Sequence, residues 1–495
     1  MSAAPAFMRV RNTPVHESSP ALSRGRGARW FALPLALVLS GCASLDFEAT
    51  LARTNQDTAR FTQGAVALAQ TSAQESARAQ QASRLLAQPL QQSEAVQLAL
   101  VNSPALQALL AQRWADAAAI AQTGRMANPV LSLEQARLGD ELEIGRRLSF
   151  GLLELLTLPQ RQARAARALE AAQIQLSAEV VDQVTLVRQA WVRAVAAQQT
   201  LIYAQQVNAL AQSSAELARR MHAVGNFNTL QRARQHAFYA DASGQWALAQ
   251  HSALAAREAL VRALGLDDAQ AAQLRLPERL PMLPEAPHTA QVVGQTAQAQ
   301  RLDVRMAQAA LASALQAQGL GDITSLTDIE LGVRRDTVFD DAAGTQATRQ
   351  GTEMSFRLPL LDGGELRRTA LGAQSLALAQ RLKATLSEAS SGLREGYSAY
   401  RTAYDLARHY RDEVLPLRKT IADENLLRYN GMLIGVFELL ADTKDQIATV
   451  QAAIAAEQQF WLADAALQAA QIGRPTTAAL GAPAAKSAGA GNAAH

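Results

Sequence analysis

Hydrophobic residues recur at helical spacing over most of the chain. From Gln160 to Val224, 65 consecutive residues contain neither glycine nor proline, and a helix of that length would be roughly 100 Å long. Apolar residues recur along this segment every 11 residues, at Leu169, Val180, Trp191 and Ile202. That interval of ~3.67 residues per turn predicts nearly straight packing with a slight right-handed supercoil. Gly225 and Asn226 end the run, and a second helix from about Phe227 to Leu264 is expected to return antiparallel.

Shorter segments before the long helix alternate between apolar and polar residues, as expected for a strand with one apolar face. In the clearest of them the apolar positions are Leu142, Ile144, Leu148 and Phe150. The positions between them are Glu143, Gly145, Arg147 and Ser149. Arg146 is the exception, because it falls on the apolar face. An earlier helical pattern from Ser93 to Thr123 is interrupted at Pro104, and Pro129 predicts a turn before the first strand.

The same order of elements recurs about 200 to 210 residues later, which indicates an internal duplication. The segment from Leu302 to Gln318 is helical, and alternating segments follow at Ile329 and at Met354. Long helical regions then extend from Glu365 to Tyr429 and from Val436 to Ile472. Each repeat is therefore expected to supply two strands and a pair of long helices.

The N-terminus has the pattern of a secretory signal. An apolar run from Trp30 to Leu39, too short to span a bilayer as a mature helix, follows a basic segment. Its last residue begins the tetrapeptide Leu39-Ser40-Gly41-Cys42, which resembles the bacterial lipobox, and the sulfur of Cys42 is the predicted site of diacylglycerol attachment. By analogy with such lipoproteins, Ala43 after the cysteine favours export to the outer membrane. The alternative is a buried cysteine that follows an apolar stretch by chance.

These patterns divide the chain into six parts. The predicted parts are a signal peptide (1–41), a lipidated and weakly specified N-terminal arm (42–91), a first repeat (92–275), a proline-rich linker (276–288), a second repeat (289–472) and a disordered tail (473–495).

Composition and charge exclude several classes of protein. The formal net charge is +3, from 47 Lys+Arg and 44 Asp+Glu, but residues 1–41 hold five arginines and one glutamate, a net of +4. The remainder is therefore 3 − 4 = −1, so no basic face is left for nucleic acid to bind. An apolar fraction of 49% is too high for a disordered chain. A single cysteine excludes a disulfide framework and a cysteine-based zinc site.

The four predicted strands raise the question of how their edges are covered. Strands of about 8 to 11 residues suit a tilted transmembrane strand, but membrane barrels begin at about eight strands, so four cannot close one. Open edges are not tolerated in lipid. Either the strands form ribbons in water, or several protomers share one barrel, which the predicted lipid anchor and the lack of an apolar helical span favour. Three copies would supply twelve strands and twelve long helices. The alternative is a water-soluble, monomeric helical-bundle lipoprotein that acts as a scaffold or binding module.

Motifs in both repeats resemble those of one family. The segment 93–106 resembles the opening pattern EAvxxALxxNPxL, and Ala127-Asn128-Pro129 with Leu131 and Leu133 resembles the entry of the family's first strand. Residues 358–364 resemble a strand exit PLFDGG, and residues 428–440 resemble a hairpin tip RYxxGxxxxxELL. On these motifs the stretch from about Gln92 to Ile472 is similar to the outer-membrane factor (TolC) family of tripartite efflux systems. The stretch 149–164 departs from the family pattern and resembles, weakly, the branch for heavy-metal and copper efflux.

The resemblance implies a mainly α fold with a small β part. Three copies would form a 12-stranded outer-membrane β-barrel continued by a periplasmic α-helical barrel. It also implies function: a passive exit duct that receives substrate, metal ions being one class, from an inner-membrane pump through a periplasmic adaptor. The predicted partners are two further copies of the chain, the adaptor, the pump and outer-membrane lipid.

The two turns that join paired long helices are the expected periplasmic entrance and adaptor contact. The residues assigned to these tips are Gly225, Asn226, Phe227, Arg428, Gly431, Met432, Leu433, Ile434 and Gly435. Glycine allows a tight reversal, and Phe227, Met432, Leu433 and Ile434 are expected to be exposed apolar anchors. The alternative for these residues is the ordinary chemistry of a turn between two helices, which also requires glycine and a few apolar contacts.

Enzyme chemistry is not expected. The sequence has no nucleophile elbow, phosphate-binding loop, dinucleotide fingerprint or zinc helix motif, so we expect no catalytic residues and no cofactor besides the lipid on Cys42. His222, His236 and His251 fit no compact metal-ligand pattern. Asp442 and Asp445 either form acidic rings in a trimeric pore or lie on a solvated face near a helix N-terminus. Arg334, Arg335 and Asp336 are expected at a strand end, at the membrane surface or the lumen wall.

Overall fold

The computed structural model describes residues 46–289, 301–324, 328–340, 342–358 and 360–475. The predicted signal peptide, the predicted lipid-attachment residue Cys42 and most of the predicted disordered tail lie outside the described residues. Among the helices within these residues, none is long and apolar enough to cross a membrane.

The first repeat contains the long helix that the sequence predicts. The helices of this repeat are α4 (Gln92–Asn102), α5 (Pro104–Thr123), α6 (Leu152–Leu156), α7 (Leu158–Ala223), α8 (Thr229–Leu264) and α9 (Asp268–Gln273). Helix α7 has 66 residues, and α8 packs along it. Asn228 caps α8, because its side chain accepts a hydrogen bond from the Gln231 amide. The break at Pro104 is also confirmed: Ser103 caps α5 and Pro104 occupies its first turn.

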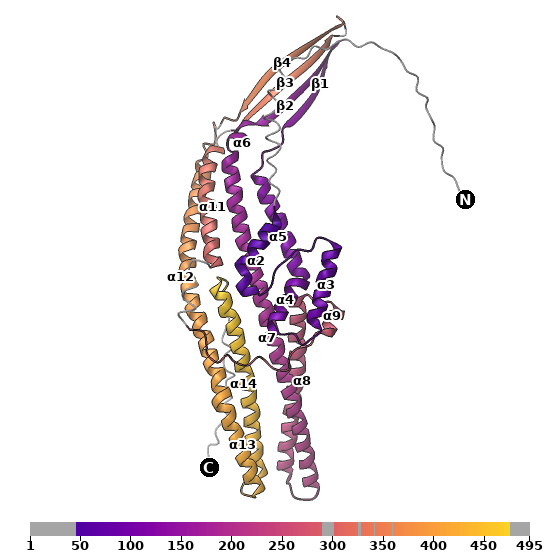
Figure 1. Ribbon diagram of the computed structural model, residues 1–495, viewed down its shortest axis with the longest axis vertical. Coiled ribbons are helices and arrows are strands. Elements are labelled where there is room, and N and C mark those ends of the chain that lie inside the picture. Colours follow the sequence, from indigo (N-terminus) through magenta and orange to yellow (C-terminus); the bar gives the residue numbers. More distant parts are fainter. Residues whose placement is uncertain (1–45, 290–300, 325–327, 341, 359, 476–495) are drawn as a thin grey trace, which may run out of the picture. The chain divides into compact units, whose positions relative to one another are not determined.

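Four strands form one antiparallel sheet in the order β1-β2-β3-β4 (Figure 1). They are β1 (Val130–Leu138), β2 (Glu141–Gly151), β3 (Ile329–Asp340) and β4 (Thr345–Phe356). The central pairing of β2 with β3 joins the two repeats in a single sheet. The prediction for the last strand, an alternating segment from Met354 to Leu360, is wrong in extent, because β4 begins at Thr345 and ends at Phe356. It is also wrong for Arg334, Arg335 and Asp336, which lie in the middle of β3 instead of at its end.

The predicted second repeat has the same order of elements as the first, and its long helical regions lie where the sequence predicts them. Its helices are α11 (Leu302–Thr324), α12 (Glu365–His409), a π-helical turn (Tyr410–Val414), α13 (Leu415–Asn430) and α14 (Val436–Gln471). Helices α12 and α13 continue into one another through the π-helical turn, although Pro416 lies in the first turn of α13. Proline has no amide hydrogen for the usual hydrogen bond to the carbonyl four residues earlier. The changed hydrogen-bond spacing of a π-helical turn just before Pro416 lets the helix continue without that bond.

The core centres on the middle of α7. Trp191 is fully buried there, and its indole nitrogen donates a hydrogen bond to the Leu90 carbonyl at 2.8 Å. Around it pack aliphatic residues of α4, α8 and the start of α11. The predicted arm also contributes, since it forms α2 (Phe47–Thr62) and α3 (Ser72–Leu86), and α2 packs on α7. These two helices are not expected from the sequence.

Candidate functional site

The two faces of the sheet differ in polarity because the strand period is two residues. One face holds ion pairs: Arg147 of β2 with Glu353 of β4 at 2.9 Å, and Arg334 of β3 with Asp336 of the same strand at 2.7 Å and with Glu143 of β2 at 3.6 Å. Gly145 lies between them, and a Cβ there would be 3.2 Å from an Asp336 carboxylate oxygen. This polar face is therefore closely packed with paired charges.

The opposite face is apolar over the half of the sheet nearest the helices. The exposed residues on this face include Leu131, Leu133, Leu148, Val333, Met354 and Phe356. Arg146 lies among them, as the sequence pattern predicts, and its side chain donates to the Thr337 hydroxyl at 3.3 Å. A sheet with one apolar face exposed in a single chain indicates a surface that another molecule or a membrane covers.

The edges of the sheet are open in one chain. The strand order places β1 and β4 at the two edges, and each pairs on one side only within the described residues. Strands of 9 and 12 residues with free backbone groups readily pair with other strands.

The first predicted tip is the turn that connects α7 to α8, and backbone hydrogen bonds hold it closed. The amides of Asn226 and Phe227 both donate to the Met221 carbonyl, at 2.9 and 3.2 Å. Gly225 has φ +80°, a conformation that only glycine adopts readily. The ring nitrogen Nδ1 of His222 lies 2.8 Å from the Phe227 carbonyl oxygen. Phe227 is half-buried, so its expected exposure is wrong.

The second turn connects α13 to α14 and presents the more exposed apolar surface. The amide of Leu433 donates to the Arg428 carbonyl at 2.8 Å, and Met432 has φ +61°. Met432 is 93% exposed and Leu433 is 78% exposed, as expected, whereas Ile434 is half-buried. In Figure 1 both turns lie at the end of the helices away from the sheet.

The two carboxylates beyond the second turn face a cation that sequence analysis missed. Arg418 of α13 lies 3.9 Å from an Asp442 oxygen and 3.6 Å from an Asp445 oxygen. The Asp442 side chain is 11% exposed and that of Asp445 is 67% exposed. A uniformly solvated helix face is therefore wrong for Asp442. The sequence could have predicted this contact. Arg418 lies 13 residues before Gly431 and Asp445 lies 10 residues after Gly435, so two antiparallel helices joined at this turn bring them to similar heights.

The two hairpins also contact each other above the turns. Phe238 of α8 packs with Val207 and Ala211 of α7, and Ile447 of α14 packs against this cluster. The ammonium nitrogen of Lys444 lies 4.9 Å from the centre of the Phe238 ring, a cation–π distance.

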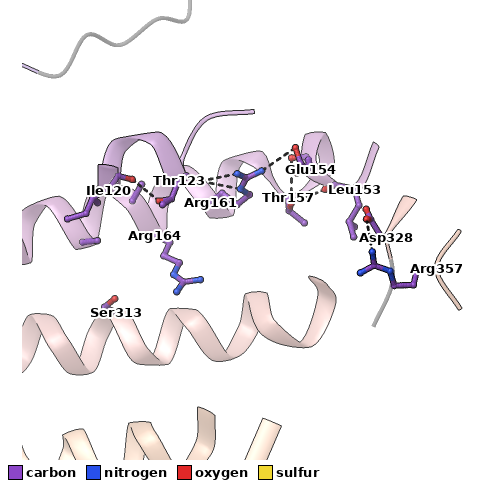
Figure 2. Close-up of a pocket in the computed structure, with 12 residues that line it drawn as sticks. Ile120, Thr123, Leu153, Glu154, Thr157, Arg161, Arg164, Ser313, Asp328 and Arg357 are labelled. Atoms are coloured by element: carbon purple, nitrogen blue, oxygen red, sulfur yellow. Dashed lines mark hydrogen bonds and ion pairs between the residues drawn. The ribbon is translucent and has the colours of Figure 1, made fainter. Parts of the chain in front are cut away.

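A cavity of about 680 Å³ lies where the helices meet the strands, lined by residues of α5, α6, α7 and α11 together with Asp328 and Arg357 (Figure 2). Its polar residues mainly secure the chain before β1. Arg161 donates to the Thr123 and Arg125 carbonyls at 3.1 and 2.9 Å, and Glu154 accepts from the Ala127 amide at 3.2 Å. The cavity thus supports the entry to the sheet.

A buried polar network joins the two repeats and the linker near the middle of α7. The Arg188 guanidinium donates to the Gln468 side chain at 2.7 Å and to the Phe61 carbonyl at 2.5 Å. Asp464 accepts from Gln468 at 2.7 Å and lies 3.8 Å from the ring of His288. Burial raises the pKa of the Asp464 carboxyl, against the opposing effect of His288 and Arg188.

The structure brings no metal site together among the residues it describes. No group of three or more histidine, cysteine, aspartate or glutamate side chains in these segments is arranged to hold a metal ion. His222 lies on α7, and His236 and His251 lie on α8. None of the three belongs to a group of that kind.

Comparison with known proteins identifies the fold. The chain is similar to the Campylobacter jejuni CmeC outer membrane channel, with 14% identity over 80% of this chain and 87% of that chain and a TM-score of 0.64. It is similar to the outer membrane protein VceC of Vibrio cholerae, with 16% identity over 80% and 97% of the two chains and a TM-score of 0.62. The same holds for CusC, with 16% identity over 79% and 92% and a TM-score of 0.62. No family model and no curated protein sequence matches the chain. The mainly helical fold with a small antiparallel sheet, expected from the motifs, is confirmed.

Proposed function

We propose that the chain is the outer-membrane channel of a tripartite efflux system and belongs to the outer-membrane factor (TolC) family. The observation that carries the proposal is the four-stranded sheet, with one ion-paired face, one apolar face and two open edges, on a fold shared with solved outer-membrane channels. A membrane barrel needs an apolar outside, a polar inside and no edges.

Three copies meet these needs together. The β4 edge of one copy pairs with the β1 edge of the next, which gives a closed barrel of twelve strands. The polar face with Arg147, Arg334 and Asp336 then lines the lumen, and the apolar face contacts lipid. The long hairpins α7–α8 and α12–α14 continue the wall into the periplasm as a helical barrel. At 66 residues α7 is roughly 100 Å long, enough to cross much of the periplasm.

The turns after α7 and after α13 form the periplasmic entrance and contact the adaptor. Met432 and Leu433 supply the apolar anchors, since they are the most exposed apolar side chains of the second turn. Asp442 and Asp445 carry one negative charge more than Arg418 neutralises, so in three copies they form acidic rings above this entrance that attract cations. Cys42, outside the described residues, carries the lipid that holds the arm of each copy to the membrane.

The duct acts passively, without catalysis. An inner-membrane pump supplies the energy, and the adaptor connects the pump to the entrance. Metal ions are one class of cargo, on the weak resemblance of residues 149–164 alone; the compound whose toxicity rises in a deletion strain would identify the cargo.

The adaptor contact is tested by replacing Met432 and Leu433 together with aspartate. Both side chains are exposed, and aspartate tolerates the positive φ at Met432, so the trimer should form normally while adaptor copurification is lost. Leu254→Asp is the matched control, since Leu254 is 58% exposed on α8, far along the chain from either turn. Full adaptor binding by the double variant would refute the assignment of the tip.

The channel itself is tested by reconstituting the purified protein in a planar lipid bilayer. A duct gives discrete conductance steps that require the three-copy complex. A protein that inserts no conductance and stays monomeric would instead be a periplasmic scaffold or binding module.

A further inference from the structure

Two arginines lie directly opposite each other where the apolar half of this face ends; beyond them, away from the helices, the same face also carries Gln135, Arg137, Thr337 and Thr348. Arg146 of β2 and Arg335 of β3 are paired in the antiparallel register, a position that places opposite Cβ atoms about 5 Å apart. Arg146 is the sixth of the 11 residues of β2, so the pair lies near the middle of its strands. Both side chains are exposed.

The sheet does not neutralise this pair. Within the described residues neither guanidinium forms an ion pair with a carboxylate; Arg146 donates a hydrogen bond to the Thr337 hydroxyl, which carries no charge. The nearby acids Glu143, Asp336 and Glu353 belong to the other face, where they pair with Arg147 and Arg334. Like charges directly opposite each other destabilise a sheet, so an anion bound between the two guanidinium groups would stabilise the pair.

The surroundings of the pair suit an amphipathic anion. A hollow of about 650 Å³ on the sheet is lined by Arg146, Arg335, Gln350, Leu131, Leu148 and Val333, among others. The guanidinium groups present planar sets of N–H donors that match the oxygens of a phosphate. The leucine and valine side chains lie on the helix side of the arginines, where they offer contact for hydrocarbon.

We propose that Arg146 and Arg335 together bind the phosphate group of a membrane lipid, whose acyl chains cover Leu131, Leu148 and Val333. This inference rests on the proposed function, because only a barrel directs this face to lipid. A neighbouring copy does not supply the missing anion, since it pairs with β1 or β4 and the arginines lie on the two central strands.

The test measures lipid binding to the purified three-copy complex by native mass spectrometry, with diphosphorylated lipid A as the probe. The double variant Arg146→Gln/Arg335→Gln should bind it at least about 10-fold more weakly, as expected for loss of charge-assisted hydrogen bonds. The double variant Arg147→Gln/Arg349→Gln, which removes equal charge from the polar face, should bind as the wild type does. Inorganic phosphate at millimolar concentration should not displace the lipid, because the acyl chains contribute to its binding.

A second measurement separates binding from folding. Removing two lipid-facing charges should raise the thermal stability of the complex in bilayers of uncharged glycolipids, which lack phosphate, and lower it when lipid A is added to these bilayers. Where the glutamine variant fails to assemble, Arg146→Lys/Arg335→Lys keeps both charges and should bind lipid A more weakly than the wild type, because it loses the planar donors.

Equal lipid A binding by the assembled wild type and the glutamine variant would overturn the inference and leave the channel intact. Displacement of lipid A by inorganic phosphate would overturn it too, since the site would then take a free anion. A wild-type protein that forms no membrane-embedded trimer would overturn both the inference and the proposed function.

Discussion

Replacing Arg188 by methionine should loosen the arm from the body of the protein. Arg188 is 7% exposed on α7 and donates to the Phe61 carbonyl of α2 and to Gln468 of α14. Its guanidinium carbon also lies 4.4 Å from the centre of the Phe61 ring. One side chain therefore holds the arm and the second repeat to the long helix of the first.

The cost follows from these contacts. Each hydrogen bond from a charged donor contributes about 1.5–3 kcal/mol, and a partly desolvated cation–π contact contributes about 1 kcal/mol. Burial opposes this gain, since it disfavours the charged guanidinium and lowers the pKa of Arg188. Methionine also refills part of the volume. We expect a net loss of about 2–4 kcal/mol in the local stability of α2.

Hydrogen exchange measures this loss residue by residue. A loss of about 2–4 kcal/mol accelerates exchange of the α2 backbone amides by roughly 30- to 1,000-fold, if α2 opens as a unit. Arg193→Met is the matched control, because Arg193 is exposed on the same helix and makes one 3.5 Å hydrogen bond to Gln189. Unchanged exchange in α2 of the Arg188 variant would refute the role of Arg188 as the link between arm and body.

Three further predictions concern the network, a helix end and the entrance. Because burial raises the folded-state pKa of Asp464 above its unfolded value of about 4, its contribution to stability is present at low pH and is lost as pH rises through the folded pKa. Asp464→Asn should therefore raise the melting temperature at pH 7 and change it little below pH ~4; an equal shift at both pH values would contradict this. Gly265→Ala should cost about 2–4 kcal/mol of unfolding free energy, since φ is +67° and the new Cβ would lie 2.5 Å from Cδ of Pro104; a urea midpoint equal to that of the wild type would count against it. Replacing Asp442 and Asp445 by asparagine should reduce the preference for cations in planar-bilayer recordings, and an unchanged permeability ratio would rule out the acidic rings.

The sequence predicted the long helices well because their signal is simple. An uninterrupted run without glycine or proline and an 11-residue apolar period leave α7 no other regular structure. The turns at Gly225 and Gly431 were equally clear. The alternation in β2 also located Arg146 on the apolar face, a feature that the structure confirms.

The arm helices were missed because their own sequences specify them weakly. Helix α2 buries Thr54, Thr58 and Thr62 as well as phenylalanine and leucine, so its apolar stripe is interrupted. Such a helix is stabilised by packing on α7, and propensity alone does not reveal it. The helical region predicted from Glu365 to Tyr429 is continuous in spite of Pro416, because a π-helical turn lies just before the proline.

The surface residues were predicted less well than the elements that carry them. Exposure of Phe227 and Ile434 depends on how the chain folds back within each turn, which spacing does not fix. The pairing of Arg146 with Arg335 depends on the register between two strands that are distant in sequence. The link from Arg188 to Phe61 and Gln468 likewise requires the tertiary fold.

The claim that three copies share one barrel is tested most directly without the lipid anchor. The chain from Ala43 onward, exported behind a cleavable signal peptide that attaches no lipid, should still fractionate with the outer membrane. After detergent extraction it should have the mass of three chains and dissociate to monomers on heating. A monomer recovered from the water-soluble periplasmic fraction would contradict the account.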